Sequence, residues 1–128
     1  VERKNNPYKG CWAFPGGFMN PDETAEQCSS RELFEETSLR VDDWQQIGAF
    51  SDVGRDPRER VVTVAFYAFV DLNSIGVVVG HDDASCAKWF DINDLPDLAF
   101  DHAEILAQAM KQTGLRSENC AQKTGKEV

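Results

Sequence analysis

Residues 61–70 (VVTVAFYAFV) are apolar at almost every position. An uninterrupted apolar run of this length is typical of a β-strand that is covered on both faces. Such a strand lies in a sheet between helices, so the sequence predicts an α/β fold. Other segments have the patterns of elements that would complete this fold: strands over 11–14, 44–52 and 87–92, and helices over 25–37 and 101–112.

Each predicted helix begins with a pair of residues spaced like an N-cap and its partner. Thr24 precedes Gln27 by three positions, and Asp101 precedes Glu104 in the same way. In a capping box, such side chains bond to the free N–H groups of the first turn. We therefore expect Asp101 and Glu104 to be caps rather than ligands, and His102 to be structural or exposed.

The net charge of the chain limits the classes of molecule that it can bind. The chain has 22 acidic and 13 basic residues and a net charge of −9, which argues against nonspecific binding to nucleic acid or to an anionic membrane. No apolar run reaches the ~18 residues of a membrane-spanning helix, and no secretory signal opens the printed sequence. The cysteines lack the close spacing of zinc ligands, so we expect free thiols and a cytoplasmic location: Cys11, Cys28, Cys86 and Cys120.

The length of 128 residues fits one domain, which we expect to span residues 1–112. Residues 113–128 are uniformly polar and are predicted to form a helix end and a tail. The printed sequence begins at Val1 rather than at a methionine, and we expect further residues upstream.

Three glutamates lie on one face of the first predicted helix. At about 100° per residue, Glu32, Glu35 and Glu36 fall within an arc of about 100°. Arg31 lies four residues before Glu35 and can pair with it, which leaves two carboxylates uncompensated. A solvated helix surface is one interpretation. The other is a site for a hard divalent cation such as Mg²⁺, which takes one or two carboxylates together with substrate phosphates. The turn at Gly16 could add a backbone carbonyl, because no side chain blocks the approach.

The spacing of the charged residues favours the cation site. Gly17, Glu23, Arg31-Glu32 and Glu35-Glu36 are separated by five, seven and two residues. This pattern resembles the signature of the Nudix hydrolases, which cleave a nucleoside diphosphate joined to another group. The match runs from residue 17 to residue 39 and departs from the family only at Ser38, where members carry glycine.

The resemblance implies a Nudix-type α/β/α sandwich with a mixed β-sheet between helices, and Mg²⁺ or Mn²⁺ as cofactor. The implied metal ligands are carboxylates and one backbone carbonyl, with Glu36 the main ligand: Glu32, Glu35, Glu36 and Gly16. Arg31 would orient these carboxylates, and Glu23 would support the loop after Gly17. Members of the family carry one more strand before this point, which residues 1–4 would represent only in part.

Outside the signature, residues 50–70 and 98–110 look like the branch of the family that hydrolyses ADP-ribose to AMP and ribose 5-phosphate. The likeness extends to sugar-nucleotide-sensing domains of transcriptional regulators. Those regulators need an additional DNA-binding domain, and no segment of the printed sequence is long or basic enough to form one. A Nudix enzyme for nucleoside triphosphates, such as oxidised ones, is the third interpretation. The oligomeric state stays open, a homodimer included.

The loop GRDPRER (54–60) contains the candidate substrate contacts. Arg55 or Arg58 would reach the terminal ribose or a phosphate, because a guanidinium pairs with such oxygens at two points. A solvated connection between two strands is the alternative, since Gly and Pro mark turns and mixed charges keep a loop soluble.

The catalytic base varies within the family, between a signature glutamate and an acid on a later loop. Glu35 and Glu36 are candidates of the first kind. In GHDDAS (80–85), Asp83 is a candidate of the second kind and Asp82 a candidate substrate contact. Both aspartates fit a plain turn as well.

Overall fold

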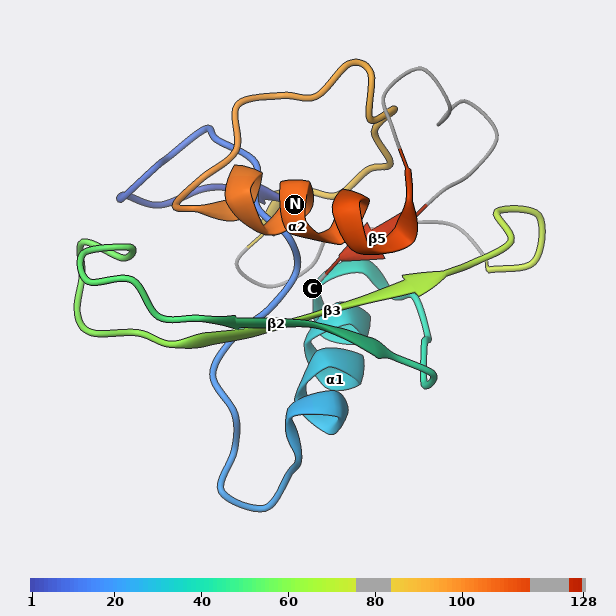
Figure 1. Ribbon diagram of the computed structural model, residues 1–128, viewed down its shortest axis with the longest axis horizontal. Coiled ribbons are helices and arrows are strands. Elements are labelled where there is room, and N and C mark those ends of the chain that lie inside the picture. The colour runs from blue at the N-terminus through green and yellow to red at the C-terminus, as the bar shows by residue number, and fades with distance from the viewer. Residues whose placement is uncertain (76–83, 116–124, 128) are drawn as a thin grey trace.

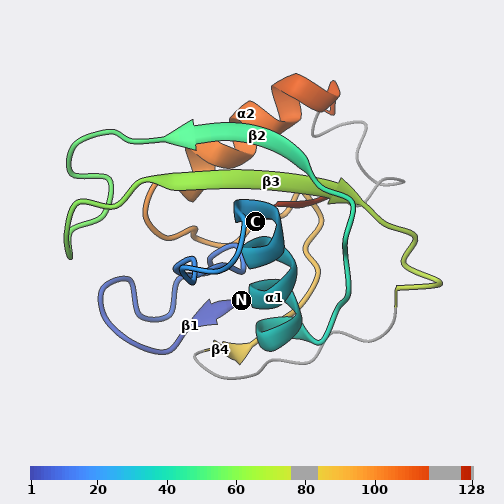
Figure 2. The same ribbon diagram turned by 90° about the horizontal axis from the view of Figure 1, so that it is seen from below.

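The computed structural model describes residues 1–75, 84–115 and 125–127. The elements are, in chain order, β1 (Glu2–Arg3), α1 (Ala25–Thr37), β2 (Gln45–Phe50), β3 (Thr63–Phe69), β4 (Ala84–Cys86), α2 (His102–Thr113) and β5 (Gly125–Glu127). The two helices cover opposite faces of the sheet that contains β2 and β3 (Figures 1 and 2). This arrangement confirms the predicted α/β sandwich. None of the helices in these ranges has the length and apolar character needed to cross a membrane.

The main sheet has the order β2-β3-β5, and both of its pairings are antiparallel. β1 and β4 form a second antiparallel pair. Trp12 makes an antiparallel bridge to Glu2 and a parallel bridge to Leu98. Within the described residues, this isolated bridge to Leu98 is the only parallel pairing, and it lies outside the named strands of the two sheets.

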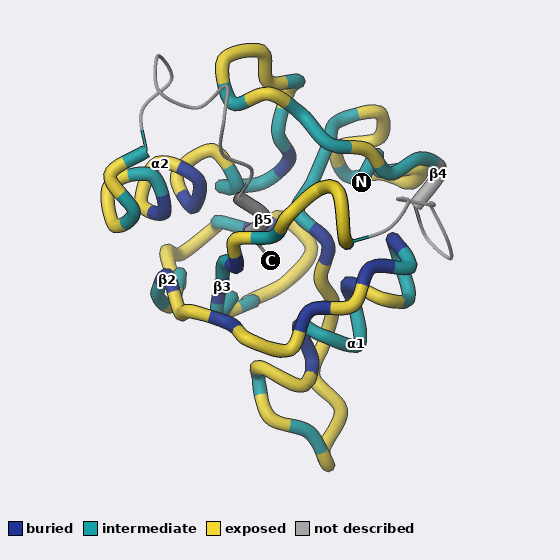
Figure 3. Tube along the Cα trace, turned by 90° about the vertical axis from the view of Figure 1, so that its right-hand side faces the viewer, coloured by how far each residue is buried: buried dark blue, intermediate teal, exposed yellow. Residues whose placement is uncertain are grey.

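β3 is covered on both faces, as its apolar sequence predicts. Its neighbouring residues Ala65 and Phe66 point to opposite sides, because side chains alternate along a strand. Phe66 lies in a core cluster with Leu33 of α1, and Ala65 lies in a second cluster with Ile105 of α2. Figure 3 shows buried residues on both helices, and these are Cys28, Ser29, Leu33 and Thr37 on α1 and Ile105, Leu106 and Ala109 on α2.

α1 begins and ends where the sequence predicts. The hydroxyl of Thr24 accepts a hydrogen bond from the Gln27 N–H at 3.1 Å, and the Gln27 side chain accepts one from the Thr24 N–H at 2.8 Å. At the other end, Ser38 is left-handed, with φ 67°, and its N–H donates to the Phe34 carbonyl at 2.8 Å. Ser38 thus has the backbone conformation that a glycine would adopt more easily.

Three predicted segments differ from the structure. Residues 11–14 contribute only the bridges at Trp12. Residues 87–92 form no strand; the strand in this part of the chain is β4, which ends just before them at Cys86. The apolar residues of 87–92 pack instead: Trp89 contacts the cluster on the α1 side, and the Phe90 ring meets Trp12 edge-on at 4.7 Å. Residues 125–127, assigned to a polar tail, pair with β3.

Candidate active site

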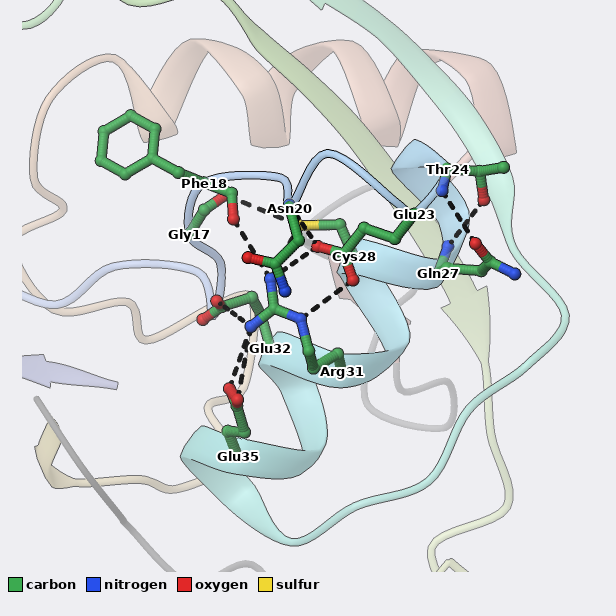
Figure 4. A network of polar contacts seen from close by, with 10 residues as sticks. All are labelled: Gly17, Phe18, Asn20, Glu23, Thr24, Gln27, Cys28, Arg31, Glu32 and Glu35. Atoms are coloured by element: carbon green, nitrogen blue, oxygen red, sulfur yellow. Dashed lines mark hydrogen bonds and ion pairs between the residues drawn. The ribbon is translucent and has the colours of Figure 1, made fainter.

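Arg31 is the centre of a polar network on α1 (Figure 4). Its guanidinium donates to both carboxylate oxygens of Glu23, at 3.0 and 2.7 Å. Nη1 also donates to Glu32 at 2.7 Å and to Glu35 at 3.1 Å, while Nη2 donates to the Phe18 carbonyl at 3.1 Å. Arg31 therefore pairs with three carboxylates: the pair with Glu35 follows from helical spacing, and the structure adds Glu32 and Glu23.

The network shifts the pKa values of its members in different directions. Hydrogen bonds from Arg31 and from the Asn20 N–H lower the pKa of Glu23 to about 2. Burial raises the pKa of Glu32, helped by the nearby charges of Glu35 and Glu23 and opposed by Arg31. A buried carboxylate of this kind gains most from a bound cation, because a positive charge offsets the cost of burying the negative one.

The loop that precedes α1 closes over two of the glutamates. The Gly16 N–H donates to the Glu36 carboxylate at 2.8 Å. A Cβ atom at Gly17 would lie 2.6 Å from the carboxyl carbon of Glu32, so any other residue at this position would displace that side chain. The carboxylates of Glu32 and Glu36 are thus held against adjacent residues of one loop.

The donor set fits a hard divalent cation. Among the residues that the structure describes, no three acidic, thiol or imidazole side chains form a ready-made metal cluster; Arg31 bonds to both Glu32 and Glu35 instead. Mg²⁺ needs only one or two carboxylates, since water and substrate phosphates complete its shell. Glu32 and Glu36, beside a glycine loop that leaves the backbone accessible, supply this number.

A cavity of about 560 Å³ opens in front of these carboxylates. Six of the sequence-predicted site residues line it: Gly16, Gly17, Glu32, Glu36, Arg55 and Arg58. Glu35 is not among the described lining residues; its side chain is 41% exposed and turned to Arg31. Asp82 and Asp83 lie outside the described residues.

The two arginines of the 54–60 loop are held differently. Arg55 is 4% exposed and donates at two points to Asp101, at 2.8 and 2.6 Å. Asp101 is the N-cap residue of α2, as predicted, but its side chain makes no cap bond, because Arg55 takes its carboxylate. Arg58 pairs with Asp56 at 2.6 Å, and its side chain is 43% exposed at the cavity.

Two residues of this cavity have no counterpart among the predicted site residues. The ring centroid of Phe100 lies 5.1 Å from Cζ of Arg58, and the backbone of Phe100 is left-handed, with φ 52°. His102 accepts a hydrogen bond from the Phe14 N–H at its Nδ1, and burial lowers its pKa to about 4. No local sequence pattern predicts either residue, because their contacts are with residues far away in the sequence: Phe100 with Arg58, and His102 with Phe14.

Comparisons with known proteins agree with this geometry. A family model described as "NUDIX domain" matches residues 1–109. The ADP-ribose pyrophosphatase of Methanocaldococcus jannaschii is 43% identical over 111 residues, which are 87% of this chain and 64% of that protein. The chain therefore spans a little under two thirds of this curated relative.

Solved structures are similar as well. The NUDIX domain of Shewanella oneidensis NrtR, complexed with ADP ribose, has a TM-score of 0.75 at 32% identity, over 88% of this chain and 75% of that chain. A bifunctional NMN adenylyltransferase/ADP ribose pyrophosphatase from Francisella tularensis, complexed with AMP and an Mn ion, has a TM-score of 0.74 at 29% identity, over 88% and 36%.

Proposed function

The chain belongs to the Nudix family, and on this premise we propose that it is a divalent-metal-dependent pyrophosphohydrolase that converts ADP-ribose to AMP and ribose 5-phosphate. One observation carries the proposal: Glu32 and Glu36 are held against Gly16-Gly17 at the wall of a cavity of about 560 Å³ that also contains Arg58. This volume lies within the range of small-molecule sites. The 43% identity with an ADP-ribose pyrophosphatase supports the choice of substrate.

The residues divide the chemistry between them. Glu32, Glu36 and the Gly16 carbonyl would hold Mg²⁺ or Mn²⁺, with Glu35 as a further ligand. A cation held there would supply positive charge to neutralise the diphosphate and polarise a phosphorus centre. Arg31 orients the carboxylates through its bonds to Glu32 and Glu35.

The hydrolysis itself needs a water and a base. The water oxygen forms a bond to one phosphorus, the bridging P–O bond breaks, and the departing phosphate keeps the bridging oxygen. Glu35, Glu36 or Asp83 takes the water proton. Arg58, exposed at the cavity, contacts the far ribose or a phosphate, and Asp82 is a second candidate contact.

The proposal includes the location and the partners of the protein. It acts in the cytoplasm without nucleic acid, as a monomer or a homodimer. Among the described cysteines, Cys11, Cys28 and Cys86 are free thiols, which fits a reducing compartment.

A ligand-sensing role is the second candidate, since the NUDIX domain of NrtR, complexed with ADP ribose, has a similar structure. The two functions differ in turnover. We expect the protein with Mg²⁺ to convert ADP-ribose to monophosphates, which a coupled phosphatase detects, and to act on triphosphates, detected with inorganic pyrophosphatase, at a much lower kcat/KM. Tight ADP-ribose binding by calorimetry without product formation would establish the sensor instead. A preference for triphosphates would establish the third interpretation.

A further inference from the structure

The segment that leads into the site runs beside the segment that leads into α2. The Trp12 N–H donates to the Asp97 carbonyl, and the Ala99 N–H donates to the Trp12 carbonyl, both at 2.8 Å. These two bonds are one step of a parallel ladder, with Trp12 opposite Leu98. In the next step of such a ladder, the Phe14 N–H would donate to the Ala99 carbonyl.

The backbone ladder stops at this step. Phe100 has a positive φ of 52°, which turns its chain away from the extended direction. The Ala99 carbonyl accepts from the His102 N–H at 3.1 Å, inside its own turn. The Phe14 N–H donates instead to Nδ1 of His102 at 3.1 Å, and the two rings stack at 5.2 Å with 9° between their planes. A side chain thus takes the place of a backbone acceptor.

The loop of the candidate metal site begins directly after Phe14. Pro15 is fully buried, has no N–H and has a nearly fixed φ, so little freedom separates Phe14 from Gly16. The Gly16 N–H donates to the Glu36 carboxylate at 2.8 Å. The start of α2 is fixed in turn, because Asp101 holds Arg55 at two points.

We propose that His102 is a positioning residue for the metal site: through Phe14 it holds residues 14–17 in the register that brings the Gly16 N–H to Glu36. The inference rests on the proposed function, since it takes Glu36 as a metal ligand. Nδ1 accepts a hydrogen bond from the Phe14 N–H, so it carries no proton and the imidazole must be neutral. Its buried environment and the charges of Arg55 and Arg3 favour this neutral form.

Variants of His102 separate the hydrogen bond from the packing. His102→Asn places an amide oxygen near the position of Nδ1 and keeps the acceptor. His102→Phe keeps the ring against Phe14 and loses the acceptor, and His102→Gln places its oxygen near Nε2 instead. Gln112→Ala is the matched control, because it removes one bond of α2, to the Ile47 carbonyl at 2.6 Å, at the far end of the helix.

The readout is the Kd for Mn²⁺ of the substrate-free protein, measured by electron paramagnetic resonance, with melting temperatures alongside. We expect His102→Phe and His102→Gln to weaken Mn²⁺ binding by about 10- to 100-fold, the effect of losing a partner of a metal ligand. His102→Asn should stay near the parent. Gln112→Ala should melt earlier with an unchanged Kd.

Two results would overturn the inference: parent-like Mn²⁺ affinity in folded His102→Gln, or a loss of affinity in His102→Asn as large as in His102→Gln. His102→Gln keeps a polar side chain at this position, so the test does not depend on His102→Phe folding. Failure of the proposed function looks different: the parent would then bind Mn²⁺ without hydrolysing ADP-ribose, and the Kd values of the variants would still decide the role of His102.

Discussion

Arg31 and Glu23 form a two-point ion pair, with Nε 3.0 Å from one carboxylate oxygen and Nη2 2.7 Å from the other. The pair ties the middle of α1 to the loop in front of it (Figure 4). Because two nitrogens are committed to Glu23, Nη1 is held where it meets both Glu32 and Glu35. One arginine thus fixes the loop and two of the candidate ligands together.

Replacing Arg31 with lysine tests this arrangement. Lysine keeps the positive charge but offers a single point contact in place of a planar fork, so it cannot hold Glu23 at two points while reaching Glu32. We expect kcat/KM for ADP-ribose to fall by about 10- to 100-fold, the scale for residues that orient metal ligands. The control is Arg40→Lys, since Arg40 stacks on Phe34 at 4.2 Å and is not one of the predicted site residues. Equal activity in both variants would contradict the role of Arg31.

Glu36→Gln should abolish most turnover and leave the fold intact. The glutamine oxygen can still accept the Gly16 N–H that Glu36 binds at 2.8 Å, so the loop keeps its place while the charge is lost. We expect kcat to fall by at least ~10²-fold, the effect of removing a major charge-stabilising group. Glu26→Gln, an exposed glutamate in the first turn of α1, should behave like the parent. Near-parental activity of Glu36→Gln would remove Glu36 from the site.

The sequence predicts α1 closely because its start and end depend on local chemistry. Thr24 and Gln27 bond to each other across one turn, and Ser38 comes directly after the last helical residue. The shared face of Glu32 and Glu36 is local too, since it depends only on helical periodicity. Strand β3 is also predicted from a local pattern: its continuous apolar run indicates a strand that is buried on both faces.

The features that the sequence does not predict depend on partners far along the chain. Asp101 has the spacing of a cap, but Arg55, 46 positions away, takes its carboxylate. Residues 87–92 have a strand-like pattern because Trp89 and Phe90 are apolar; they pack without joining a ladder. An apolar pattern indicates that a segment is buried, but it does not distinguish a buried strand from a buried loop.

Ser38→Gly should raise stability and leave turnover unchanged. Ser38 has φ 67°, a conformation that costs a residue with a Cβ roughly 1–2 kcal/mol. We expect a gain of about 1 kcal/mol in the free energy of unfolding, because glycine loses more backbone entropy on folding. The reverse change, Gly114→Ala, should lose a similar amount, since Gly114 has φ 75° and a Cβ there meets nothing within 4 Å. A tenfold rise in activity with Ser38→Gly would instead favour the sensor interpretation.

Arg55→Ala and Arg58→Ala should fail in different ways. Removing Arg55 leaves the carboxylate of Asp101 nearly buried and unpaired, so we expect a loss of about 3 kcal/mol in the free energy of unfolding. Arg58→Ala should fold normally and raise KM for ADP-ribose by the equivalent of ~1.5–3 kcal/mol, a lost charged hydrogen bond. Its control is Arg60→Ala, in the same loop. If Arg58→Ala and Arg60→Ala have the KM of the parent, the loop makes no substrate contact through Arg58.

His102 should make stability depend on pH in a known direction. Burial lowers its pKa from 6.5 to about 4, so its contribution is complete above about pH 6.5 and is lost as the pH falls towards 4. At about 1.4 kcal/mol per pKa unit, the loss is about 3 kcal/mol. Urea unfolding of the parent and of His102→Asn, at steps between pH 7 and 4.5, isolates this group. Glu23, with its pKa lowered to about 2, loses its contribution only below about pH 4.5. The pKa of Glu32 is raised, so its effect on stability changes with pH in the opposite direction. Glu32 is present in both proteins, so its effect cancels when their free energies of unfolding are subtracted. A difference that does not change with pH would mean that the pKa of His102 is the same in the folded and the unfolded protein, so that its site does not hold the imidazole neutral.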